Sequence, residues 1–290
     1  MRGIAREMCN STHSLFRCRA SRRVCVPYKR FAAIRRRKSN PRTPTRIPRL
    51  RYVTETLQPS VGWGVLHLFC KIGPSTDPSA VATAVKQVVE AQAGVEAQPG
   101  GAAHQVVAFS ILGHKADIGF LAIGPDWVVL RRFQTAIQQA GLVVADSYVS
   151  LTELSEYSKG MPEEHLRSRL QPTLPPEGKR AICFYPMSKR RGETDNWYRL
   201  DFEDRKRLMI EHGVSGRRFA GRVVQLVTGS AGIDDYEWGV TLFGVHPDDL
   251  KDTVYAMRFD EASALYADFG PFYTGIVGPI DEVLAEIGLT

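Results

Sequence analysis

One short segment contains three kinds of reactive or polar side chain that could line one wall of a site. Residues 183–189 read CFYPMSK. Side chains alternate between the two faces of a strand, so Tyr185, Met187 and Lys189 should project from one face as a phenol, a thioether and an ammonium. Pro186 indicates an edge strand or an interruption of the sheet. The same pattern also fits a tyrosine and a methionine packed in a core, followed by a solvated basic run.

His212 could be a metal ligand. It lies in a helix that we expect to begin at Asp201, an N-cap candidate, and helical spacing places it over Leu208 and Met209 on the apolar face. A histidine in that position is usually a hydrogen-bonded core residue. A neutral imidazole on an apolar wall is also what an iron porphyrin takes as its axial ligand. The residues alone leave both interpretations open.

Three other polar residues have weaker signals. Strand alternation places the Gln225 amide on one face with two valines, where burial without a partner would cost about 1–3 kcal/mol. The protein or a ligand must therefore satisfy this amide. Arg169 and Ser263, taken alone, resemble ordinary surface residues. The chain has no glycine-rich nucleotide loop, no serine-hydrolase elbow and no zinc-protease motif.

Hydrophobic periodicity predicts the elements that position these residues. We expect the order strand, helix, two strands, helix, strand, repeated once. The first copy has strands at 65–72, 106–112, 118–123 and 142–151, a helix from Asp77 that Gly94 closes, and a helix from Asp126. The second copy has strands at 181–187, 223–228, 238–243 and 272–277, and helices from Asp201 and Pro247.

This pattern indicates an α+β fold built from two βαββαβ repeats. The sheet faces that the helices leave uncovered should be buried against each other. We expect a first repeat at residues 60–154, a link at 155–180 and a second repeat at 181–280, preceded by a basic extension at 1–51.

Charge is divided unevenly along the chain. The net charge is +7, yet residues 1–51 contain sixteen Lys and Arg against Glu7 alone, while the remainder has 22 basic and 30 acidic residues. This extension could be a transit peptide, an arm for nucleic acid or a membrane surface, or upstream sequence translated from a start assigned too early. No apolar run approaches the roughly 20 residues that span a bilayer. Sparse cysteines favour a reducing, cytoplasmic compartment.

Several motifs together resemble the coproheme decarboxylases of the chlorite dismutase-like family. The resemblance covers about residues 61–278 and is most specific in the second repeat. The motifs are FYPMSKRR at 184–191, DNWY at 195–198, EHG at 211–213, QLVTGS at 225–230, DDYEWGVTLF at 234–243 and YAMRFDE at 255–261.

The resemblance implies two ferredoxin-like repeats, a homopentamer, and a porphyrin held in the second repeat. It implies that Tyr185 is the redox-active tyrosine and that His212 is the axial ligand to the substrate iron. Lys189 would be catalytic and substrate-binding. The other implied substrate-contacting residues are Tyr157, Arg169, Tyr185, Pro186, Met187, Ser188, Gln225 and Ser263.

The implied reaction converts two propionates of iron coproporphyrin III into vinyl groups, with hydrogen peroxide as oxidant and haem b as product. The porphyrin is then both substrate and cofactor, and the resemblance implies that a coproporphyrin ferrochelatase delivers it. Arg169 and Lys189 could bind its carboxylates by charge-assisted hydrogen bonds.

Three alternatives remain open. A chlorite dismutase would resemble its relatives in having an arginine above the iron, where this chain has Gln225. A non-catalytic haem-binding or haem-sensing protein would keep His212 without needing Tyr185 and Lys189. A nucleic-acid binder would depend on the basic extension alone, and we expect no nucleic-acid partner.

Overall fold

The computed structural model of this chain describes residues 56–90, 104–158, 160 and 162–289. The predictions for the extension at 1–51 and for Gly94 lie outside these residues. None of the helices in the described ranges is long and apolar enough to cross a membrane.

The first repeat has the predicted order of elements. Asp126 begins α2 as its N-cap, and its side chain accepts a hydrogen bond from the backbone N–H of Val128 at 2.8 Å. The elements are β1 (Gly64–Lys71), α1 (Pro78–Glu90), β2 (Gln105–Ile111), β3 (Ile118–Gly124), α2 (Trp127–Gln139) and β4 (Val143–Thr152).

The second repeat also has the predicted order, and Asp201 caps α4 by accepting from the N–H of Asp204 at 2.9 Å. Its predicted elements are β5 (Ala181–Lys189), α4 (Phe202–Arg217), β6 (Val223–Gly229), β7 (Trp238–Gly244), α5 (Pro247–Met257) and β9 (Tyr273–Val277). The structure adds elements that periodicity did not predict: α3 (Glu163–Leu170) within the link, the 3-10 helix η1 (Trp197–Arg199), α6 (Glu261–Ala264), β8 (Ala267–Phe269) and α7 (Ile280–Glu286).

The strands form one closed sheet. Their order is β7-β6-β4-β1-β3-β2-β9-β5-β8, and β7 also pairs with β5. The expected pair of facing sheets is therefore a single barrel, joined where β4 pairs with β6 and β2 with β9. At the second joint the backbones of β2 and β9 approach each other closely at Gly275. A Cβ at this position would collide with the Ser110 carbonyl oxygen, so the position requires glycine.

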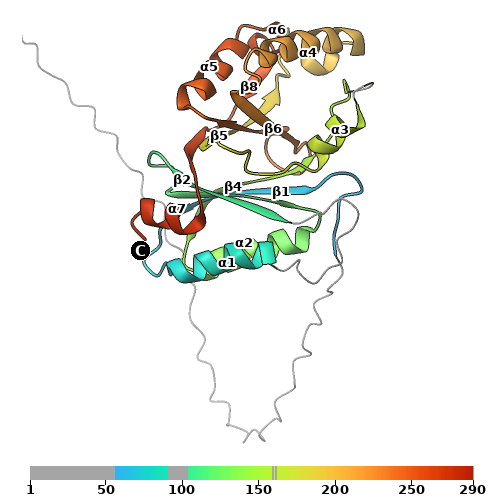
Figure 1. The fold of residues 1–290 in the computed structure, drawn as a ribbon. Helices are drawn as coiled ribbons and strands as arrows, with labels where there is room; N and C mark the ends of the chain where they lie inside the picture. The colour runs from blue at the N-terminus through green and yellow to red at the C-terminus, as the bar shows by residue number, and fades with distance from the viewer. Residues whose placement is uncertain (1–55, 91–103, 159, 161, 290) are drawn as a thin grey trace, which may run out of the picture. The chain divides into compact units, whose positions relative to one another are not determined.

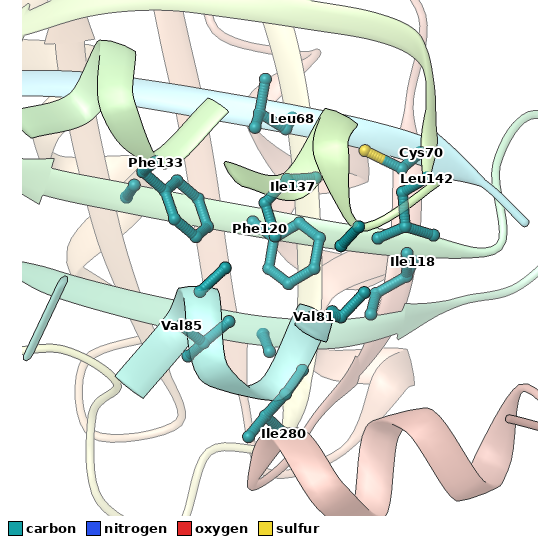
Figure 2. Packing of buried hydrophobic residues seen from close by; sticks show 14 of the residues in the cluster. Leu68, Cys70, Val81, Val85, Ile118, Phe120, Phe133, Ile137, Leu142 and Ile280 are labelled. Carbon is teal, nitrogen blue, oxygen red and sulfur yellow. The ribbon is translucent and has the colours of Figure 1, made fainter. Parts of the chain in front are cut away.

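Two large apolar cores lie on opposite sides of the first-repeat strands. Both repeats contribute to the barrel interior, where Phe69 and Phe109 meet Phe184 and Phe243. The outer core lies between the first-repeat strands and α1, α2 and α7, as Figures 1 and 2 show. On the second repeat, α4, α5 and α6 lie on the outer side of the barrel (Figure 1). The burial of the uncovered sheet faces against each other is confirmed.

Candidate active site

Strand register places two of the predicted site residues, Tyr185 and Gln225, on the outer face of the second repeat. Gln225 lies opposite Leu242, which in turn lies opposite Cys183. Directly paired residues share a face, and the face recurs every second residue, so Tyr185 lies on the same side. Tyr185 packs with Leu242 in an outer cluster that also contacts Met187, whereas Phe184 points into the barrel.

Tyr185 is a buried phenol in an aromatic environment. Its ring stacks on Phe272 at 4.6 Å between centroids and lies 5.6 Å from Phe269. Burial raises its pKa well above the usual range of a tyrosine. Among the described residues its hydroxyl has no hydrogen-bonding partner. Tyr185 is therefore neutral at physiological pH, and it can lose an electron only if the proton leaves with it.

A cavity of about 320 Å³ lies between α4 and this sheet face. It brings together Arg169 from α3, His212 from α4 and Gln225 from β6. Arg217 lines it as well, one helical turn beyond Gly213, so α4 contributes a second cation that sequence reasoning missed. The other lining residues are Gly216, Phe219, Ala220, Val223, Leu242, Thr253 and Met257.

The position of Gln225 differs from the sequence interpretation. Its side chain is exposed and lines the cavity rather than being buried in the sheet. The described part of the chain offers its amide no hydrogen-bonding partner. Because Gln225 is exposed, its amide is accessible to solvent and does not incur the penalty that burial would impose.

His212 is held by the short helix α6. Its Nδ1 lies 3.0 Å from Oδ2 of Asp260, the N-cap of α6, and 3.4 Å from the Ser263 hydroxyl. Burial would raise the pKa of Asp260, but its hydrogen bonds with His212 and Ser263 outweigh burial and hold the pKa below its usual value. An ionised Asp260 favours a proton on Nδ1, which leaves the Nε2 lone pair free to bind a metal. Nδ1 therefore has a partner inside the protein, as a core histidine would, while the ring still lines a cavity.

Lys189 contacts the same short helix. Its Nζ donates to the Ala262 carbonyl oxygen at 2.9 Å and lies 4.2 Å from the Trp197 ring centroid. Burial lowers its pKa to about 8, opposed by the negative charges of Asp260 and Glu237. The predicted basic run in water is therefore wrong for Lys189, because this residue is only 8% exposed. Helix α6 links the axial-ligand candidate to the carboxylate-binding candidate.

Of the ten predicted site residues, Arg169, His212 and Gln225 line the cavity, while Tyr185, Met187, Lys189 and Ser263 lie outside its lining. The remaining three lie elsewhere. Tyr157 stacks on Phe202, and its hydroxyl accepts from Arg205 at 3.3 Å. The Ser188 hydroxyl accepts from a backbone N–H at 3.2 Å, on the side of β5 that faces β7. Pro186 lines a separate cavity of about 70 Å³ on the other face of β5.

Pro186 interrupts the sheet, as its residue type predicts, but β5 is not an edge strand. On one side β5 pairs with β7, and on the other it changes partner from β9, at Phe184, to β8, at Met187. The Pro186 carbonyl accepts from Gly270 on that second side. The hydrogen-bonding site that proline lacks therefore falls in the gap between β9 and β8.

Sequence reasoning also missed Asp260, although a signal was available. Asp260 precedes Ser263 by three residues, which is the spacing of a helix N-cap and its first donor. Ser263 was expected at the surface on residue type alone, yet it is buried against His212. A capping analysis of residues 260–264 would have predicted α6. It would not have predicted contact with α4.

Comparisons with known proteins agree on one family. The chlorite dismutase family model matches residues 79–278. A coproheme decarboxylase from Staphylococcus carnosus (strain TM300) is 41% identical over 235 residues, which cover 75% of this chain and 92% of that protein.

Solved structures show the same fold. A heme-binding protein from Thermus thermophilus is 35% identical, with a TM-score of 0.68 over 81% of this chain and 97% of that one. A mutant chlorite dismutase from Candidatus Nitrospira defluvii is 19% identical, with a TM-score of 0.62 over 79% and 97% of the two chains. At that identity the likeness supports the fold alone. The family match and the 41% identity together show that this chain belongs to the chlorite dismutase family.

Proposed function

We propose that this protein converts iron coproporphyrin III into haem b by oxidative decarboxylation with hydrogen peroxide. Each of two propionates, with one peroxide and one proton, becomes a vinyl group, one carbon dioxide and two waters. The identity to a coproheme decarboxylase supports this assignment. The observation that carries it is that Leu242, which packs with the neutral phenol of Tyr185 on the outer sheet face, also lines the cavity that His212 lines.

The residues around the cavity fit an iron porphyrin with four carboxylates. Nδ1 of His212 is hydrogen-bonded to Asp260, so Nε2 is the nitrogen that would bind the iron. Arg169 and Arg217 line the same cavity, and guanidinium groups bind carboxylates in a bidentate geometry. The apolar lining from Leu242 suits the porphyrin ring.

In this proposal Tyr185 is the hydrogen-atom relay. The bound iron supplies the oxidising power of peroxide when substrate is present. Tyr185 gives up its proton together with an electron, because its raised pKa excludes a free phenolate. The resulting tyrosyl radical takes a hydrogen atom from a propionate, which restores the phenol. Loss of a second electron from the propionate radical to the peroxide-oxidised substrate would then release carbon dioxide and leave the vinyl group. Lys189, a buried cation on the same strand, would bind and orient that propionate.

Incubation of the purified protein with iron coproporphyrin and peroxide tests the function directly. Mass spectrometry of the porphyrin should show successive losses from two propionates, ending at haem b. Tyr185→Phe is the matched control, since it keeps the ring and its packing. Porphyrin binding without any mass change would contradict the reaction and favour haem binding as the function.

We also propose that the active form is a homopentamer that acts in the cytoplasm and receives its substrate from a coproporphyrin ferrochelatase. The sequence resemblance supports these three points. Light scattering after size exclusion should give five times the mass of the chain. A monomeric mass with full activity would contradict the pentamer.

A further inference from the structure

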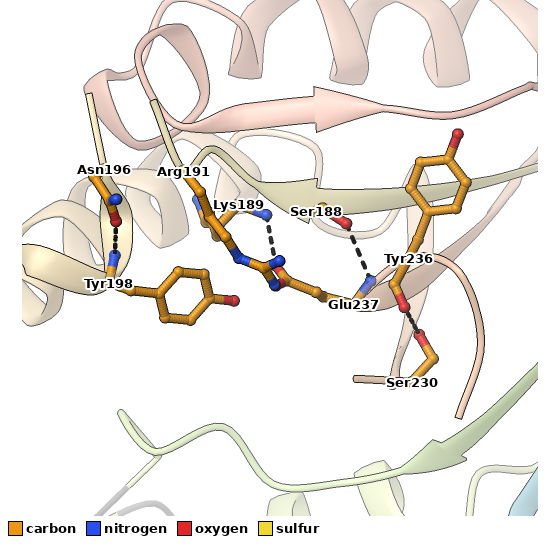
Figure 3. Close-up of polar contacts among 8 residues, drawn as sticks. All are labelled: Ser188, Lys189, Arg191, Asn196, Tyr198, Ser230, Tyr236 and Glu237. Carbon is orange, nitrogen blue, oxygen red and sulfur yellow. Dashed lines mark hydrogen bonds and ion pairs between the residues drawn. The ribbon is translucent and has the colours of Figure 1, made fainter. Parts of the chain in front are cut away.

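Glu237 is a buried carboxylate for which the proposed reaction has no use. It immediately precedes β7, and its side chain is 6% exposed. One carboxylate oxygen accepts from the backbone N–H of Lys189 at 2.7 Å, and the other forms an ion pair with Arg191. Figure 3 shows both partners converging on it. The carboxylate therefore holds the end of β5 from two directions.

Glu237 also takes the place of a strand neighbour that β5 lacks. Pairing between β5 and β7 ends at Met187, whereas pairing with β8 continues to Lys189. Beyond Met187 the Glu237 side chain accepts the N–H of Lys189 in place of a β7 carbonyl. Its backbone N–H lies 3.1 Å from the Met187 carbonyl oxygen and 3.2 Å from the Ser188 hydroxyl. Backbone and side chain together fix the last residues of β5.

Two carboxylates outside β5 act electrostatically on the Lys189 ammonium. Asp260 lies on the α6 side, and Glu237 lies on the β7 side. Asp260 is already paired with His212, while Glu237 is paired with the exposed guanidinium of Arg191. Removing Glu237 or Arg191 should therefore change the field at Lys189 in opposite directions.

Tyr198 completes the outer side of this network. Its ring lies 5.2 Å from the Arg191 guanidinium carbon. Burial, together with the nearby Glu237 carboxylate, raises the Tyr198 pKa to about 12, so the phenol stays neutral near physiological pH. Glu237 and Arg191 are then the charged groups of the network that can be varied separately.

We propose that Glu237 is a positioning residue that places the Lys189 ammonium and keeps it charged for binding a substrate carboxylate. This inference rests on the proposed function and deepens it. The positive charge of Arg191 partly offsets the effect of the Glu237 negative charge on Lys189. Neither residue needs to touch the substrate.

The test is the pH dependence of iron coproporphyrin affinity, followed by absorbance titration from about pH 6 to about pH 10. In the wild-type protein, affinity should fall as pH rises through the pKa of Lys189. Glu237→Gln keeps an acceptor oxygen but removes the charge, and should move this fall about one pH unit lower. Arg191→Gln should move it higher. In a Lys189→Ala background, neither substitution should shift the profile.

Shifts in the same direction, or a profile unchanged by both substitutions, would overturn the proposal. A lower thermal unfolding midpoint for Glu237→Gln with an unmoved pH profile would show a structural role only. If Glu237→Gln does not fold, the exposed Arg191→Gln variant still decides by the direction of its shift. A wild-type protein that binds the porphyrin but releases no carbon dioxide would defeat the proposed function, while the pH profile would still test Glu237.

Discussion

The two repeats have the same order of elements but use their outer faces differently. On the outer face of the first repeat, α1, α2 and the C-terminal α7 pack against the strands, and apolar side chains such as Phe133 of α2 and Phe120 of β3 fill the space between them (Figure 2). In the second repeat the corresponding face has a cavity of about 320 Å³. Its buried apolar cluster is smaller: Cys183, Tyr185, Val240, Leu242 and Leu250.

The difference shows how a duplicated fold can divide its tasks. Close packing between helices and strands supplies stability, because apolar burial and dispersion contacts are lost when a gap opens. A face that leaves a gap forgoes part of that stability and gains room for a ligand. Substitutions in the first repeat should therefore act on folding, and those in the second on chemistry.

The largest expected effect is the loss of chemistry without loss of binding in Tyr185→Phe. A hydrogen bond is worth roughly 0.5–1.5 kcal/mol, so a purely hydrogen-bonding role would slow turnover by about tenfold at most. If Tyr185 is the relay, phenylalanine cannot replace it. We therefore expect Tyr185→Phe to form essentially no haem b while it binds the porphyrin with near-normal affinity. Product formation measured by mass spectrometry distinguishes the relay role from the hydrogen-bonding role. A rate within about tenfold of wild type would place the radical on another residue, with Tyr157, Trp197 and Tyr198 next to test.

The second prediction contrasts the two outer faces directly. Phe120→Ala should lower the free energy of unfolding by about 3–5 kcal/mol, since Phe120 is fully buried in the filled core. Met257→Ala removes a residue that lines the cavity and should cost far less. Denaturant unfolding measures the free energy of unfolding of both variants. Equal losses would show that the second face is packed as tightly as the first.

The third prediction concerns His67, a histidine enclosed in the barrel interior. Burial lowers its pKa to about 3, from an ordinary value of 6.5. Because the unfolded chain binds the proton first, the stability that neutral His67 contributes is full above pH 6.5 and is lost as pH falls towards 3. The loss should approach about 1.4 kcal/mol per pH unit, and His67→Leu should flatten it. Unfolding curves of both proteins across this range check the prediction, and an equally steep loss in His67→Leu would contradict it.

The fourth prediction assigns the iron ligand. His212→Ala should weaken porphyrin binding at least about tenfold or change its absorption spectrum, because the axial bond is lost. Tyr185→Phe should leave the spectrum unchanged. An unaltered spectrum in His212→Ala would return His212 to the role of a core histidine.

The smallest effect is expected at Gln225, which is exposed on the cavity wall. Gln225→Ala should change the free energy of unfolding by less than about 0.5 kcal/mol. The neutral amide provides no cation to stabilise anionic oxygen species, so the wild-type protein should release no oxygen from chlorite above background. An oxygen electrode measures this. Rapid release would show that an arginine is not required.

Local sequence patterns determined much of the framework. Alternation predicted the common face of Tyr185 and Met187, and the residue types of Asp126 and Asp201 predicted where two helices begin. The repeat of the βαββαβ order predicted that the sheets bury each other. Alternation and helix capping depend on interactions between residues a few positions apart, which a single sequence displays.

The tertiary structure alone decided the site's contacts. Asp260 meets His212 across 48 residues, and Glu237 meets Lys189 across the same separation. Closure of the sheet, exposure of Gln225 and burial of Lys189 likewise depend on which elements pack together. Periodicity shows which face a side chain occupies but not which distant group lies opposite, because that partner is selected by the packing of the whole chain.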